Sequence, residues 1–115
     1  MNNSLLANLL AFYEEDPADP FNAYALAIEY SKSDPGEAGR FFDLLLEKHP
    51  DYLPTYYHAG AFFAALEKVE KAEEIYRKGV ELALAQKNAK SHRELLSAYN
   101  NFLDELEDCA APVCA

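Results

Sequence analysis

The side chains best suited to chemistry are three histidines, His49, His58 and His92, and two cysteines, Cys109 and Cys114. Metal-binding helices usually place two ligands one turn apart, as in Glu-x-x-His or His-x3-His, so that both lie on one face. No histidine has such a partner at that spacing, and the sequence lacks both a glycine-rich phosphate loop and a Gly-x-Ser-x-Gly elbow. We therefore expect no catalytic residues and no metal or other cofactor.

The two cysteines stand close together in the sequence, on either side of Pro112. In an oxidising compartment Cys109 and Cys114 could form a disulfide, but such a short loop would contribute little to stability. Two sulfurs without a second pair of ligands are a weak indication of zinc, and Cys114 is in the wrong place for C-terminal prenylation. We expect residues 109–115 to be a flexible tail.

The charge of the chain excludes some kinds of partner. Twenty acidic residues against ten basic ones give a formal net charge of −10, and no cluster of Lys or Arg offsets it. Such a surface repels phosphate backbones and anionic lipids, so we expect neither nucleic-acid nor membrane binding. An acidic surface either keeps a small protein soluble or steers a basic partner, and both interpretations stay open.

The first residues do not resemble a secretion signal. They lack a basic start, Asn8 interrupts the apolar run, and acidic residues follow at positions 14–16. The apolar run is also too short to span a bilayer. We therefore expect a cytoplasmic location.

One pattern of small and large residues occurs twice in the sequence. The copies read Ala23-x2-Leu26-Ala27-x2-Tyr30 followed by Ala38-x3-Phe42, and Tyr56-x2-Ala59-Gly60-x2-Phe63 followed by Ala72-x3-Tyr76. The step from Ala38 to Ala72 is one position longer than the step from Ala23 to Tyr56, so the two halves of the pattern recur with nearly the same period. A fixed period of this size is typical of a solenoid, in which each unit buries its apolar face against the next.

The small residues of the pattern have a clear physical role. Ala27 and Gly60 lie midway along the first expected helix of each copy, and Ala38 and Ala72 lie early in the second. Residues without bulk let two helices of a hairpin approach to the lower end of the usual ~8–10 Å range. We therefore expect these four positions to be buried contacts between helices.

The repeated pattern resembles the tetratricopeptide repeat (TPR), whose signature reads Trp-x2-Leu-Gly-x2-Tyr, then Ala-x3-Phe, then Pro. The chain departs from it in lacking Trp and in having Leu84 where the second copy would end in Pro. The resemblance implies an all-α fold: a short α-solenoid of two TPR helix hairpins, with an N-terminal helix and a C-terminal capping helix. The expected single domain covers residues 1–108, with hairpins at 20–52 and 53–87.

The resemblance extends to both ends of the domain. Pro17 precedes Pro50 by the same step that separates Ala23 from Tyr56, so residues 4–15 occupy the place of a second helix from a degenerate earlier repeat. After Asn88, which we expect to break the preceding helix, residues 89–108 carry an apolar stripe from Leu95 to Leu106. This last segment resembles the capping helix of TPR arrays.

Helix starts are marked in the first copy. Asp19-Pro20 and Asp34-Pro35 each offer a capping carboxylate followed by proline at the first helical position. Glu37 follows Asp34 at the spacing of a capping box, in which each side chain bonds to the backbone N–H of the other. We therefore expect helices to begin at both prolines.

The resemblance also implies where a partner would bind, because the first helix of each TPR hairpin lines a concave groove. Carried over by position, the groove residues are Phe21, Tyr24, Ala25, Ile28, Ser31 and Lys32 in the first repeat, and Pro54, Tyr57, His58, Ala61, Ala64 and Ala65 in the second. This groove is aromatic and aliphatic, with almost no charge. TPR domains that grip a chaperone's C-terminal carboxylate need Lys, Asn and Arg at such positions, so that activity is not implied.

Two functions compete on this sequence. The first is a non-enzymatic interaction module that binds another protein, or a peptide segment of it, through the groove residues Phe21, Tyr24, Ile28, Tyr57, His58 and Ala61. The alternative is a self-associating homo-oligomer whose groove is filled, with Tyr24 and Tyr57 packed against the end helices. An enzyme or metal protein is the third possibility, without a motif to support it.

Overall fold

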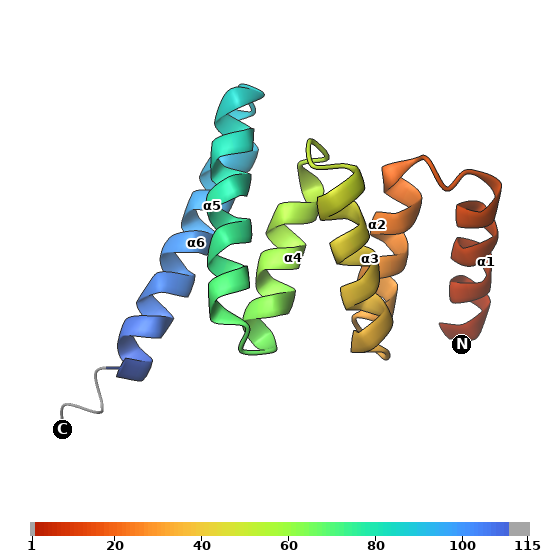
Figure 1. Ribbon diagram of the computed structural model, residues 1–115, viewed down its shortest axis with the longest axis horizontal. Coiled ribbons are helices and arrows are strands. Elements are labelled where there is room, and N and C mark those ends of the chain that lie inside the picture. The colour runs from red at the N-terminus through yellow and green to blue at the C-terminus, as the bar shows by residue number, and fades with distance from the viewer. Residues whose placement is uncertain (1, 111–115) are drawn as a thin grey trace. The chain divides into compact units, whose positions relative to one another are not determined.

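The computed structural model describes the backbone of residues 2–110 and the side chains of residues 5–107. This part of the chain is all-α, as predicted, and contains six helices and no strand. The helices are α1 (Asn2–Glu15), α2 (Pro20–Tyr30), α3 (Pro35–Lys48), α4 (Pro54–Ala65), α5 (Val69–Ala85) and α6 (Ala89–Ala110) (Figure 1). The chain divides into two compact units, the first ending at Thr55 and the second beginning at Tyr56.

The first unit is built on a helix hairpin. α2 packs against α3, and α1 packs against α2. The ring of Phe41 lies between two tyrosines, with centroid distances of 5.4 Å to Tyr13 and 5.9 Å to Tyr30. The predicted small positions Ala27 and Ala38 are both fully buried, so the sequence pattern correctly identifies where helices α2 and α3 approach each other.

The second unit depends on two glycines at close contacts between helices. A Cβ atom on Gly60 of α4 would lie 2.6 Å from the Tyr76 ring of α5. A Cβ atom on Gly79 of α5 would lie 2.6 Å from Tyr56 Cβ and 3.2 Å from Leu95. Apart from the two glycines, the core consists of Tyr56, Ala59, Phe63, Ala72, Ile75, Tyr76, Ala83, Leu95 and Phe102.

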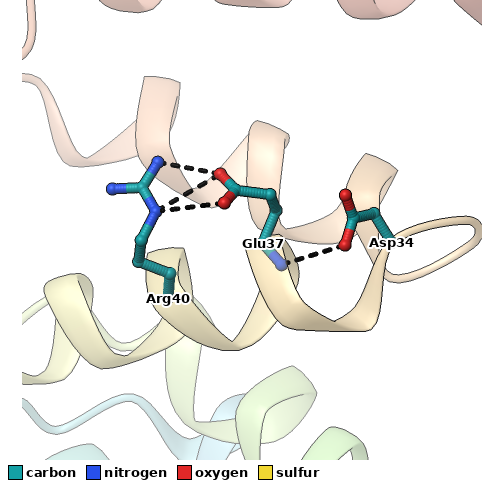
Figure 2. Close-up of polar contacts among 3 residues, drawn as sticks. All are labelled: Asp34, Glu37 and Arg40. Atoms are coloured by element: carbon teal, nitrogen blue, oxygen red, sulfur yellow. Dashed lines mark hydrogen bonds and ion pairs between the residues drawn. The ribbon is translucent and has the colours of Figure 1, made fainter.

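Both predicted capping aspartates are at helix starts. Asp19 accepts a hydrogen bond from Phe21 N at 3.0 Å, and Asp34 accepts one from Glu37 N at 3.3 Å. The expected capping box forms only in this one direction, because the Glu37 carboxylate binds Arg40, with Nη2 2.9 Å and Nε 3.2 Å from Oε1 (Figure 2). The second half of the box is replaced by an ion pair one turn along the helix.

Replacing Asp34 with alanine should lower the free energy of unfolding by about 1 kcal/mol, because the N–H of Glu37 would lose its acceptor. Thermal unfolding followed by circular dichroism would measure the change. Asp34→Asn keeps an acceptor oxygen and should remain close to wild type. An alanine variant as stable as the asparagine variant would show that the cap contributes nothing.

The loop between α5 and α6 differs from the expectation for Asn88. The side chain of Asn88 accepts a hydrogen bond from Ser91 N at 3.0 Å, so this residue caps the start of α6. The preceding helix, α5, ends at Ala85. After it the chain turns at Lys87, whose backbone φ of 58° lies in the left-handed region. A lysine in this conformation carries a cost that glycine would avoid, and nothing in its residue type indicates the turn.

Candidate partner-binding site

The second unit contains an open cleft of about 610 Å³ between α4 and α6, with Tyr76 of α5 also lining it. Its lining residues are Tyr57, Ala61, Ala64, Ala65, Tyr76, Arg93, Glu94, Ser97, Ala98, Asn101, Phe102 and Glu105. A volume of this size lies within the usual range for ligand-binding clefts. We take this cleft as the candidate site.

One wall of the cleft comes from α4 and consists of small side chains and one aromatic ring. Tyr57, Ala61, Ala64 and Ala65 recur at the spacing that brings residues to one face of a helix. The three alanines leave the space beside this wall empty, whereas the Tyr57 side chain stands at the cleft with 43% of its surface exposed. This wall can therefore receive apolar groups and stack against an aromatic or flat one.

The opposite wall comes from α6 and is mostly polar. Arg93, Glu94, Ser97, Asn101 and Glu105 line it, together with the apolar Ala98 and Phe102. Together they offer a cation, two carboxylates, a hydroxyl and an amide, so this wall can both donate and accept hydrogen bonds. The groove expected from the sequence has almost no charge. This cleft carries charged groups, and they come from its α6 wall. Its polar residues recur at helical spacing, but Phe102 of the apolar stripe also lines the cleft, so periodicity alone does not distinguish this wall from a solvated helix face.

Tyr76 is held in place by neighbouring rings of α6. Its centroid lies 6.1 Å from that of Tyr99 and 5.5 Å from that of Phe102. Burial raises the pKa of the Tyr76 hydroxyl, and the nearby Tyr57 and Glu105 raise it further. The hydroxyl therefore stays protonated at neutral pH and can donate a hydrogen bond at the cleft.

Two of the three site residues predicted in the second unit line the cleft. Tyr57 and Ala61 do, and His58 is not among the lining residues. The His58 ring lies edge-on to Tyr57, with centroids 5.4 Å apart. Desolvation lowers the pKa of His58, so its imidazole is neutral at pH 7.

The other three predicted site residues, Phe21, Tyr24 and Ile28, belong to the first unit. Phe21 is exposed over 55% of its surface, and its ring lies 6.3 Å from that of Tyr24. The Tyr24 ring also lies edge-on to Tyr52, at 5.7 Å. Burial raises the pKa of Tyr24, with Tyr52 adding to the effect. Tyr24 therefore packs within its own unit, and Phe21 is the more exposed ring.

The described residues offer no centre for metal chemistry. Among those whose side chains are described, no group of three or more His, Cys, Asp or Glu is placed to hold a metal ion. The side chains of Cys109 and Cys114 lie outside the described residues. No helix in the described part of the chain is long and apolar enough to cross a membrane.

The helix hairpins define the chain as a helical-repeat protein, and comparison with solved structures identifies the repeat. The crystal structure of a tetratricopeptide repeat domain protein from Salinibacter ruber is 36% identical, with a TM-score of 0.69 over 73% of this chain and 96% of that one. A solution NMR structure, also of a tetratricopeptide repeat domain protein from Salinibacter ruber, is 39% identical, with a TM-score of 0.71 over 76% and 89%. The chain therefore belongs to the tetratricopeptide repeat family.

A more distant likeness concerns the fold alone. The crystal structure of MamA is 19% identical, with a TM-score of 0.63 over 96% of this chain and 71% of that one. A scan of protein-family models found no match. A search of curated proteins found none either. The fold supports a protein-interaction module in general, since repeat arrays of this kind present extended binding surfaces.

Proposed function

We propose that the chain is a cytoplasmic, non-enzymatic interaction module that binds a segment of another protein in the cleft between α4 and α6. The observation that carries this proposal is the asymmetry of the cleft. Its α4 wall is small and apolar, with Tyr57 exposed beside it, and its α6 wall carries polar and charged groups. A peptide segment with one apolar and one polar side matches both walls.

The two walls would have different roles in binding. Apolar side chains of the partner would fill the space beside Ala61, Ala64 and Ala65 and contact the exposed ring of Tyr57. Aromatic residues at such positions often dominate binding energy. The α6 groups would hydrogen-bond to the polar side of the segment and so fix its direction. Because this wall carries charged residues, part of the affinity for the partner should weaken as the salt concentration rises.

Replacing Ala61 with glutamate should weaken partner binding by at least about tenfold, because it places a bulky carboxylate in the apolar wall. Ala61 is exposed, so we expect the variant to fold. The measurement is recovery of proteins from a lysate of the source organism, followed by titration of each recovered partner against wild type and variant.

A matched control is available on α5. Ala85 is exposed and does not line the cleft, so Ala85→Glu makes the same chemical change elsewhere. Partners recovered by wild type and Ala85→Glu but lost from Ala61→Glu would support the cleft. Partners that bind all three equally would place the interaction on another surface.

A further inference from the structure

The two ends of the cleft between α4 and α6 can be told apart from the contacts of α5. These contacts occur at two successive places: at Gly79 the neighbours are Tyr56 and Leu95, and at Tyr76 they are Gly60 and Phe102. The residue numbers rise on both neighbours from the first place to the second, so α4 and α6 run in the same direction along the cleft. Tyr57 and Arg93 therefore lie at one end, which we call the Arg93 end. Ala65 and Glu105 lie at the other, which we call the Glu105 end.

The two ends differ in charge. At the Arg93 end, Arg93 and Glu94 both line the cleft, so their opposite charges sum to zero. At the Glu105 end, the Glu105 carboxylate is the one charged group among the described residues that line the cleft. Arg93 stands twelve residues before it on α6, a distance of about 18 Å at ~1.5 Å per residue. Exposed charges so far apart are largely screened at physiological salt.

No other basic side chain compensates for Glu105. Among the residues whose side chains the structure describes, no lysine or arginine forms an ion pair with it. Lys68 and Lys71, which follow α4 in the sequence, lie over the ring of Phe63, 5.9 Å and 4.2 Å from its centroid, and neither lines the cleft. The sequence contains no Lys, Arg or His after Arg93. The Glu105 end therefore carries an uncompensated negative charge.

Other oxygen groups surround this carboxylate. Burial raises the pKa of the Tyr76 hydroxyl, and the nearby Tyr57 and Glu105 raise it further. Asn101 lines the cleft one turn before Glu105 on α6. A lysine ammonium or an arginine guanidinium has several N–H donors and no acceptor, so it suits a carboxylate with hydroxyl and amide oxygens beside it. The small side chain of Ala65 leaves room for the aliphatic stem of such a residue.

We propose that the segment bound in the cleft is basic and amphipathic: its apolar side chains lie on the α4 wall, and a lysine or arginine beyond them pairs with Glu105. This inference rests on the proposed function, because it names the chemistry of the segment that the same cleft binds. The Arg93 end has no net charge and exerts no comparable preference, so the basic residue fixes the direction of the segment. The net charge of −10 on the whole chain disfavours acidic competitors.

Three synthetic peptides of equal length test the proposal. Each carries leucines at positions i, i+3, i+4 and i+7, which form one apolar face on a helix. The residues on both sides of the leucines are lysine in the first probe, glutamine in the second and glutamate in the third, so either direction of binding brings one of them to Glu105. Calorimetric titration of the full chain should show the lysine probe binding about two- to fivefold more tightly than the glutamine probe, as expected for one exposed ion pair. The glutamate probe should bind most weakly.

Substitutions on α6 assign this preference to one carboxylate. Glu105→Gln should remove the difference between the lysine and glutamine probes, and Glu105→Lys should make the glutamate probe the tightest. Glu107→Gln is the matched control, because Glu107 is also exposed on α6 and does not line the cleft. The control should keep the wild-type order of the probes. If it loses the preference as fully as Glu105→Gln does, the preference reflects the overall charge of the chain, and the proposal is overturned.

Failure of this inference can be distinguished from failure of the proposed function. Ala61→Glu obstructs the apolar wall and should weaken binding of the uncharged glutamine probe by at least about tenfold. Three equal affinities that all fall in Ala61→Glu would retain the cleft as the binding site and overturn the basic preference. Tightest binding of the glutamate probe to wild type would assign an acidic segment instead. If no probe binds, or if Ala61→Glu changes nothing, both proposals are overturned.

Discussion

Replacing Gly60 with alanine should lower the free energy of unfolding of the second unit by about 1–3 kcal/mol. The added Cβ would lie 2.6–2.8 Å from three atoms of the Tyr76 ring, which is closer than carbon atoms can approach. Tyr76 cannot easily move away, because Tyr99 and Phe102 pack against its ring. Either the α4–α5 contact widens or the ring leaves its position, and both loosen the core. Thermal unfolding and amide hydrogen exchange in α4 and α5 would measure the loss.

The control for this prediction is Gly36→Ala in α3. A Cβ there would meet only Asp34 Oδ1, at an ordinary distance of 3.5 Å. Alanine at a helical position that tolerates it should stabilise by ~0.4–1 kcal/mol, because the unfolded chain loses conformational freedom. The two Gly→Ala changes should therefore have opposite signs. If Gly60→Ala is also neutral or stabilising, the close contact with Tyr76 does not exist.

The repeat pattern predicted the helices well because its residues are constrained both by local helix preference and by packing between helices. Ala38 and Ala72 are fully buried, since a larger side chain at either position would separate two helices of a hairpin. Asp19 and Asp34 cap helices because carboxylates accept from free backbone N–H groups and proline suits the first turn. Local preference and packing agree at these positions, which is why sequence spacing was sufficient.

The α6 wall of the cleft could not be predicted in the same way. The apolar stripe of α6 shows that the helix is packed, but Arg93 and Glu105 are polar residues of the kind that also cover ordinary solvated faces. Which of these faces meets α4 depends on the rotation of α6 about its axis. That rotation is set by Leu95 at Gly79 and by Phe102 against Tyr76. These contacts join residues far apart in the sequence.

The packing of Tyr24 has a similar explanation. Its position in the repeat correctly placed it on the first helix of a hairpin, as a candidate groove residue. Its ring contact with Tyr52 involves a loop residue that is not one of the positions of the repeated pattern. Loop conformation is not fixed by the helical period, so the repeated pattern could not predict this contact. Phe21 and Tyr57, in contrast, remain exposed.

Ending the chain at Asn88 should abolish the cooperative unfolding of the second unit, because α6 would be missing. Leu95 lies against Gly79, and Phe102 and Tyr99 pack against Tyr76. Burial of Leu95 and Phe102 contributes ~1.5–3 kcal/mol each, which together is a large share of the ~5–15 kcal/mol that stabilises a typical domain. Without α6, the Tyr76 ring would be exposed to water, and the truncated chain should aggregate.

A single substitution in the full-length chain tests the same contribution of α6 to the stability of the second unit. Leu95→Ala should cost ~2–5 kcal/mol, because the leucine is 2% exposed and its loss leaves a cavity beside Gly79. Leu84 is 66% exposed, so Leu84→Ala makes the same chemical change with an expected cost within ~0.5 kcal/mol. Unfolding by denaturant would measure both, and hydrogen exchange would show whether protection is lost in α4 and α5. A soluble chain ending at Asn88 that unfolds cooperatively, together with equal stabilities for the two leucine variants, would show that α6 is an appendage and that α4 and α5 fold without it.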